Sequence, residues 1–364
     1  MFVDERWRQV AGKEGVGDED AWLRQADARH ETYRHYAFCG KRTERSVSKV
    51  QRADLPFLLR TQMSTQQKLR IAFVPEHFAS PLLQLAAKDE SIELVPCPSG
   101  TGQIMSAIKA NEVDVAIALT ESLIAGIAKK TADFKLVGTY VTSPLNWAVI
   151  VGKDSKHQSL GDLRGEKIGI SRIGSGSQVM ASYMALREGW TDKDGNVEPI
   201  QFEVLDTFKN LRDGVNDGRA AAFMWEHFTT KPYLNEVRFI GNVPTPWHSW
   251  VVVATPSTTA PSSPLRSILE SFLSNLTTSI RSFDAADARA SSSKEFIKGH
   301  FGYPEEDVKA WLEQVSYPKG EVCEVDRAMV EKTLTTLEAA GVLKAPAEGW
   351  NLEDFVDTSV AKLQ

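Results

Sequence analysis

Short apolar runs alternate with amphipathic stretches along the chain from residue 68 onward. The apolar runs are rich in branched side chains, as buried strands are, and lie at residues 69–74, 92–97 and 114–119. The amphipathic stretches between them, at residues 79–89 and 103–110, repeat apolar positions every three or four residues, as helices do. Because a helix separates each strand from the next, the pattern predicts a mainly parallel sheet with helices on both faces.

The same alternation starts again near residue 167. Strands are predicted at residues 167–170, 201–205 and 220–224, with helices over residues 178–190 and through Leu211 and Val215. When Asn111 is aligned with Asn216, Glu121 falls on Glu226, so the second unit resembles a copy of the first. Two such lobes facing each other would bring the carboxyl ends of both sets of strands to one cleft, where open α/β sheets bind ligands.

Residues 1–62 differ in character from the rest of the chain. They lack a sustained apolar period and carry a small excess of basic side chains, whereas the remainder is acidic overall. We expect them to be a poorly ordered extension, or the product of a misplaced start codon, and to be dispensable for folding. The predicted first lobe is residues 68–147 with 250–343, the second lobe is residues 148–249, and residues 344–364 are a predicted tail.

Composition narrows the possible functions. The 364 residues are 42% hydrophobic with a formal net charge of -6, which fits about two globular domains and argues against nucleic acid as a partner. No apolar run reaches the roughly 18 residues of a membrane helix, and early acidic residues argue against a secretory signal. Cys39, Cys97 and Cys323 lack metal-binding spacing and are predicted to be reduced thiols. We therefore expect a cytoplasmic protein, a monomer in the simplest case, without membrane insertion.

Three segments resemble type II periplasmic binding proteins. SLGDLRGEKIGISRIGSGSQ resembles a glycine- and serine-rich segment of that superfamily, and QIMSAIKANEVDVAI and LRDGVNDGRAAAFMWEHF resemble its two helix-to-strand segments. The resemblance covers about residues 68–343. It is strongest to the nitrate, sulfonate and taurine binding proteins of ABC importers and to thiamine-pyrimidine precursor proteins, including an uncharacterised cytosolic fungal group. It implies two doubly wound Rossmann-like lobes joined by two crossover strands, near residues 140–151 and 242–254, with a ligand cleft between the lobes.

Two glycine-rich helix openings supply candidate anion contacts. Gly174, Ser175, Gly176 and Ser177 precede one predicted helix, and Ser99, Gly100 and Thr101 precede another. Backbone N–H groups and hydroxyls at a helix start favour an anion. Neither opening contains the Lys-Ser/Thr ending of a nucleotide P-loop, so no nucleotide cofactor, and indeed no cofactor, is predicted.

Acidic, histidine and tryptophan side chains complete the candidate site. Glu121 and Glu226 follow the two strands that were aligned above, which favours a ligand with a positive group. Tryptophans at strand ends would supply flat walls for stacking. A zinc site from His77, His227, His248 and Glu226 has no supporting spacing, and no metal is predicted. The predicted ligand-binding residues are Glu76, His77, Phe78, Ser99, Gly100, Thr101, Glu121, Asn146, Trp147, Arg172, Gly174, Ser175, Gly176, Ser177, Trp225, Glu226, His227, Trp247 and His248.

These observations favour non-catalytic binding of a small polar or zwitterionic ligand, such as an aminopyrimidine or an amino-sulfonate, in a cleft that closes by hinge motion. An enzyme on the same fold, acting on a pyrimidine or related metabolite, is the first alternative. The pyrimidine synthases of the thiamine branch carry a cysteine-rich motif that this chain lacks. A solute receptor for an ABC importer is the second alternative.

Overall fold

The chain divides into two compact units, Met1–Met63 and Ser64–Gln364. The computed structural model describes residues 67–364, and everything below concerns these residues. The predictions made for residues 1–62 and for Cys39 lie outside the described residues.

The first lobe is built on a five-stranded sheet of order β2-β1-β3-β10-β4. Strands β1, β2 and β3 are parallel, whereas β10 runs antiparallel to both of its neighbours. The sheet is therefore mixed: four strands point the same way, as predicted, and β10, which enters from a distant part of the chain, runs against them. The strands are β1 (Leu69–Phe73), β2 (Ile92–Pro96), β3 (Val115–Leu119), β4 (Lys135–Val141) and β10 (Trp250–Ala254).

The second lobe repeats this arrangement with the order β7-β6-β8-β5-β9. Here β6, β7 and β8 are parallel and β5 is antiparallel to β8 and β9. The strands are β5 (Asn146–Gly152), β6 (Ile168–Ile170), β7 (Phe202–Val204), β8 (Ala222–Glu226) and β9 (Val237–Pro244). The two sheets confirm the predicted α/β fold with two similar lobes.

The register of the internal repeat corrects the sequence alignment. Trp250 of β10 pairs with Leu119 of β3, and Trp147 of β5 pairs with Glu226 of β8, so Leu119 is the structural equivalent of Glu226. The prediction that Glu121 and Glu226 occupy matched positions is wrong by two residues. Glu226 ends its strand, whereas Glu121 lies inside the following helix.

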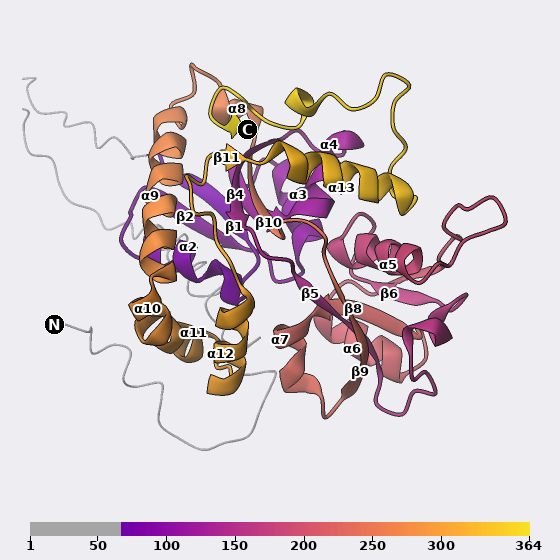
Figure 1. Cartoon of the computed structure of the whole chain (residues 1–364). Helices are drawn as coiled ribbons and strands as arrows, with labels where there is room; N and C mark the ends of the chain where they lie inside the picture. The colour runs from indigo at the N-terminus through magenta and orange to yellow at the C-terminus, as the bar shows by residue number, and fades with distance from the viewer. Residues whose placement is uncertain (1–66) are drawn as a thin grey trace, which may run out of the picture. The chain divides into compact units, whose positions relative to one another are not determined.

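The chain crosses between the sheets twice. Residues 142–145 connect β4 to β5, and residues 245–249 connect β9 to β10. Asn146 and Trp147 were assigned to the first lobe from the sequence, but β5 places them in the second sheet. Figure 1 shows both crossings running between the two sheets near the labels β5 and β10.

Helices cover the sheets and follow the predicted alternation. The helices are α2 (Ser80–Ala86), α3 (Thr101–Lys109), α4 (Thr120–Ala128), α5 (Gly176–Arg187), α6 (Phe208–Asn216), α7 (His227–Thr230), α8 (Pro256–Thr259), α9 (Arg266–Asp284), α10 (Ala286–Ala290), α11 (Ser292–Phe301), α12 (Glu305–Gln314) and α13 (Arg327–Ala339). The C-terminal helices return to the first lobe, where α9 packs against α2 (Figure 1). Helix α13 contacts both α4 and α5 and so touches both lobes.

Residues 344–364 are not a free tail. Val325 of β11 (Glu324–Val325) pairs with Leu363 of β12 (Lys362–Leu363), and Leu136 N donates to Phe355 O at 2.8 Å. Phe355 is 2% exposed, so burial of its ring holds the end of the chain on the first lobe.

One hydrophobic core runs through the first lobe and into the second. It includes Val252 of β10 together with Val149 of β5 and Met180 of α5. Alternate residues of β5, such as Ala148 and Ile150, face a smaller core on the other side of the second sheet. The second sheet is thus buried on both faces, and one of those faces shares its core with the first lobe.

Candidate functional site

The carboxyl ends of β3 and β8 lie at the junction between the lobes, the region where side chains of the two lobes contact each other. The approach is close: a Cβ added to Gly176, the first residue of α5, would lie 2.5 Å from Leu119 Cδ1 and 3.1 Å from the Trp147 ring. A Cβ on Gly100 would lie 3.9 Å from the Trp225 ring. The two lobes therefore meet in van der Waals contact along this junction.

The segment after β1 contributes three of the predicted ligand contacts, Glu76, His77 and Phe78, and all three are buried. The His77 ring is 1% exposed and lies edge-on to the rings of Tyr303 and Trp311, with centroids 5.2 and 4.6 Å away. Its Nδ1 is 3.3 Å from the Tyr303 hydroxyl. Burial lowers the pKa of His77 to about 3, so the imidazole is neutral near pH 7.

Glu226 reaches this segment from the second lobe. It ends β8 and caps α7, and its Oε2 accepts a hydrogen bond of 2.6 Å from Thr229 N. The same Oε2 lies 4.0 Å from His77 Nε2. The side chains of Trp225 and Thr229 also lie near Glu76 of the first lobe and partly offset the effect of burial on its pKa.

Both carboxyl groups of this region favour the protonated form. Burial, followed by the charge of Glu226, raises the pKa of Glu76 to about 8. Burial raises the pKa of Glu226 to about 7. We call Glu76, His77, Glu226, Thr229 and Tyr303 the acid cluster.

A third buried acid, Glu121, lies in the first turn of α4 and is 0% exposed. Trp247 Nε1, from the second crossing, donates a hydrogen bond of 2.9 Å to Glu121 Oε2. The Trp247 ring also packs on Tyr183 of α5, with centroids 5.6 Å apart. Burial raises the pKa of Glu121 to about 7. Trp247 therefore connects an acid of the first lobe with a helix of the second.

Three consecutive residues at the start of α4 each have a buried side-chain oxygen that lacks a hydrogen-bond partner in the described part of the chain. The atoms are Thr120 Oγ1, Glu121 Oε1 and Ser122 Oγ. The indole Nε1 atoms of Trp147 and Trp250, which flank the end of β3, are unpartnered as well. Buried polar atoms are nearly always hydrogen-bonded, so five unpartnered atoms on segments next to the end of β3 are unusual. We call these five residues the α4 polar cluster.

The two glycine-rich openings are less available to an anion than predicted. Ser99 N donates to Gln103 Oε1 at 2.9 Å, and Gly174 N donates to Gln178 Oε1 at 2.6 Å, so a glutamine four residues ahead occupies each loop. Thr101 Oγ1 accepts from Leu119 N. The Ser175 and Ser177 hydroxyls contact each other at 2.9 Å, Ser175 Oγ accepts from Gln178 N, and Ser177 Oγ accepts from Ser171 N. Both loops thus use much of their hydrogen-bonding capacity internally.

Arg172 joins the two openings across the junction. Its Nη1 donates to Ser99 O at 3.3 Å, and its Nη2 lies 3.0 Å from Asp206 Oδ1. The Arg172 side chain packs closely on Gly102, since a Cβ added to Gly102 would lie 3.2 Å from Arg172 Cδ. Arg172 therefore acts as an interlobe contact that is already paired with an acid.

The remaining predicted residues lie at the edges of the junction. Asn146 pairs with Pro244 through the backbone of the second sheet, and His227 Nδ1 is 3.0 Å from Asn242 Oδ1 of β9. His248 is half-buried on the second crossing, and its Nδ1 is unpartnered in the described structure. Burial lowers the pKa of both His227 and His248.

Comparison with known proteins shows which family has this architecture. Residues 147–243 match the model of the Ca3427-like PBP family. The Candida albicans CA3427 gene product, described as having the generic periplasmic binding protein fold, is 34% identical over 82% of this chain and 98% of its own, with a TM-score of 0.71. The chain belongs to the Ca3427-like family. The predicted resemblance to type II periplasmic binding proteins is thereby confirmed.

More distant structures share the fold of this Ca3427-like protein. The alkanesulfonate-binding protein SsuA of Xanthomonas axonopodis pv. citri, bound to MOPS, is 16% identical over 82% of this chain and 98% of its own, with a TM-score of 0.59. The ligand-binding component of an ABC-type import system from Staphylococcus aureus, with zinc bound, is 14% identical over 81% and 98%, also with a TM-score of 0.59. No curated protein matches the sequence.

Metal binding finds no support in the residues that the structure describes. Among residues 67–364, no three His, Cys, Asp or Glu side chains are grouped so as to hold a metal ion. Cys97 and Cys323 are free thiols, and burial raises the pKa of Cys97 to about 12. No helix within the same residues is long and apolar enough to cross a membrane.

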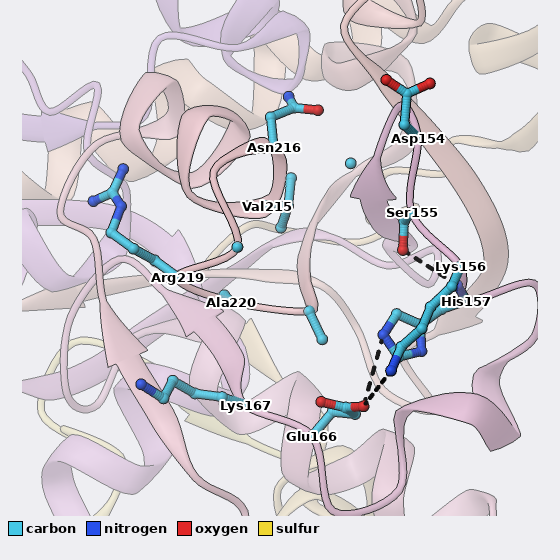
Figure 2. A pocket seen from close by; sticks show the side chains of 13 residues that line it. Asp154, Ser155, Lys156, His157, Glu166, Lys167, Val215, Asn216, Arg219 and Ala220 are labelled. Atoms are coloured by element: carbon cyan, nitrogen blue, oxygen red, sulfur yellow. Dashed lines mark hydrogen bonds and ion pairs between the residues drawn. The ribbon is translucent and has the colours of Figure 1, made fainter.

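A separate pocket of about 400 Å³ lies on the second lobe of the Ca3427-like protein, at the opposite end of β8 from Glu226 (Figure 2). Its basic side chains are paired: Lys156 Nζ and His157 Nε2 lie 3.7 and 3.8 Å from Glu166 Oε1. None of the predicted ligand-binding residues lines it. Because parallel strands of α/β proteins bind ligands at their carboxyl ends, this pocket is the weaker candidate.

Sequence reasoning missed several residues of the junction. Tyr303 and Thr229 belong to the acid cluster, and Thr120 and Ser122 to the α4 polar cluster. Thr120 and Ser122 directly follow the apolar strand that ends at Leu119, and ligand contacts often follow such strands, so the sequence could have pointed to both residues. Tyr303 lies 226 residues from His77 in sequence, and no local pattern points to it.

Proposed function

We propose that this Ca3427-like protein binds a small polar or zwitterionic ligand at the junction between its lobes, without turnover, and that the lobes separate about residues 142–145 and 245–249 to admit it. The observation that carries the proposal is Glu121, a fully buried carboxyl group with one oxygen on Trp247 and the other unpartnered. A buried polar atom left unpaired costs about 1–3 kcal/mol, which a ligand would offset by supplying the missing partner.

The chemistry of the junction favours a ligand with a donor or cationic group over a plain anion. Three buried carboxyl groups, Glu76, Glu121 and Glu226, lie there, whereas Arg172 is already paired with Asp206. A plain anion beside buried carboxylates would lose several kcal/mol. An aminopyrimidine or an amino-sulfonate would instead present donors to Glu121 and stack between Trp147 and Trp250. MOPS, bound by the Xanthomonas protein, carries a sulfonate and an amine, so the same fold accommodates such a molecule.

Lobe separation is supported by the same unpaired atoms. In the closed arrangement Thr120 Oγ1, Ser122 Oγ and Trp250 Nε1 have neither a partner in the described chain nor contact with solvent. Opening would return them to water, and ligand binding would stabilise closure. The cytoplasmic location and monomeric state remain predictions.

Calorimetry against aminopyrimidines, amino-sulfonates, sulfate and nitrate tests this proposal. We expect an amine-bearing compound to bind, and Glu121→Gln and Glu226→Gln each to weaken it by about 1.5–3 kcal/mol. The exposed Glu90→Gln variant is the matched control and should bind as the wild type does. Tight binding of a plain anion that neither junction variant alters would overturn the proposal. Mass spectrometry of the incubated panel would detect loss of a compound, which would favour the enzyme alternative.

A further inference from the structure

Two carboxyl groups from opposite lobes approach each other in the acid cluster. Glu76 follows β1 in the first lobe, and Glu226 ends β8 in the second. Thr229 N–H donates to Glu226 Oε2 at 2.6 Å, and His77, which directly follows Glu76 in sequence, has its Nε2 4.0 Å from the same oxygen. Both acids are buried, at 9% and 4% exposure.

The neighbouring charges do not balance this pair. Lys231, which lies five residues after Glu226, forms its ion pair with Asp307, and the charge of Asp307 raises the pKa of Glu226. His77 is neutral near pH 7 because burial lowers its pKa to about 3. His77, Tyr303 and Asp307 are the titratable groups that act on the pair. Beyond them, Lys231 and His227 interact with Asp307, and Tyr233 interacts with Tyr303.

If both acids were ionised, two negative charges would therefore lie in a buried region where Lys231 is already paired with Asp307. Such a pair cannot remain doubly ionised at low cost, because desolvation and mutual repulsion both oppose it. One positive charge, either a proton or a cationic group, is required to stabilise the closed junction.

The unpartnered ring nitrogen of His77 indicates where that positive charge would lie. The His77 side chain is 1% exposed, its Nε2 has no hydrogen-bond partner within residues 67–364, and this atom faces Glu226 Oε2 at 4.0 Å. That distance is too long for a direct hydrogen bond. A group with several N–H donors would bond to Glu226, and the neutral imidazole would accept another of its N–H groups in one of its two tautomers.

We propose that Glu76, Glu226 and His77 form a monovalent-cation subsite across the lobe junction, occupied by a proton in the free protein and by an ammonium-type group in the bound protein. This inference rests on the proposed interlobe binding function and adds that the ligand carries a compact N–H cation. An alkali ion is not an equivalent occupant, because it has no N–H to donate to His77.

Ammonium and potassium ions have similar radii, so their chlorides provide a test that needs no knowledge of the ligand. At about pH 8.5 both acids are largely ionised, and about 0.1 M ammonium chloride should raise the melting temperature by roughly 2–4 °C relative to potassium chloride. At about pH 6 the proton occupies the subsite and the difference should vanish.

The variants Glu76→Gln and Glu226→Gln should abolish the ammonium effect at the higher pH, and the exposed control Glu90→Gln should retain it. Equal melting temperatures of the wild type in the two salts at about pH 8.5 would overturn the inference, as would an ammonium effect that persists in both junction variants. Because no organic ligand is added, failure here is distinguishable from failure of ligand binding in calorimetry.

Discussion

Trp247 and Glu121 are 126 residues apart in sequence, yet the indole Nε1 donates to the buried carboxyl Oε2 at 2.9 Å. The bond attaches the second crossing to the first turn of α4, and it leaves Glu121 Oε1 as an unpartnered acceptor. The position of the Glu121 carboxyl group, the proposed ligand contact, therefore depends on Trp247 in the second crossing, about which the lobes are proposed to move.

We predict that Trp247→Phe destabilises the protein by about 1–3 kcal/mol, because both Glu121 oxygens are then buried without a partner. Urea denaturation measures the loss. A double-mutant cycle with Glu121→Met separates this bond from packing: the coupling energy should be at least about 0.5 kcal/mol. If Trp247→Phe costs as much in the Glu121→Met background as in the wild type, only packing was affected.

Gly176→Ala should force the lobes apart. The new Cβ would lie 2.5 Å from Leu119 Cδ1 and 3.1 Å from the Trp147 ring, and neither group has free space at the junction. We expect a larger radius of gyration by small-angle scattering and an unchanged circular dichroism spectrum. Gly299→Ala in α11, where a Cβ meets nothing within 4 Å, is the control and should leave the radius unchanged. The prediction is wrong if both variants scatter alike.

Stability should fall as the pH rises from about 6.5 to about 8.5. Folding raises the pKa of Glu76 to about 8 and the pKa values of Glu121 and Glu226 to about 7, from an ordinary value of 4.5. The folded state then holds protons that the unfolded state has released, so the free energy of unfolding decreases with pH through this window. The buried His77, whose pKa is lowered from 6.5, is still partly protonated in the unfolded state at pH 6.5, so its opposing contribution is confined to the lower part of the window.

Urea denaturation at the two pH values, in one ionic strength, checks this dependence. The variant Glu76→Gln should reduce the slope, whereas the exposed Glu90→Gln should not. A free energy of unfolding that rises across the window would contradict the assigned burial of the three acids.

A chain beginning at Met63 should fold and melt within a few degrees of the full-length protein. Residues 64–364 form a compact unit that contains both sheets and the core shared by the lobes. Differential scanning calorimetry of the two chains provides the comparison. Insolubility of the shortened chain would show that residues 1–62 contribute to the folded core.

Local patterning was enough to predict most of the strands and the two-lobed α/β class. The strand predicted at residues 69–74 is β1 (Leu69–Phe73), and the strand predicted at residues 114–119 is β3 (Val115–Leu119). Both are short buried strands whose apolar character comes from being covered on two faces, a signal that a single sequence retains. The segment Glu76 to Phe78 was predicted to contact ligand because the resemblance to the binding-protein superfamily implies a ligand contact after the first strand.

The tertiary structure alone decided how the junction is composed. It shifted the internal repeat so that Leu119 and not Glu121 matches Glu226, since strand pairing sets register and the weak sequence similarity does not. It inserted β10 and β5 antiparallel into otherwise parallel sheets, and it brought Tyr303 against His77. Burial, unpaired hydrogen-bonding atoms and the approach of charges from different lobes arise only when distant segments pack together, so no local pattern encodes them.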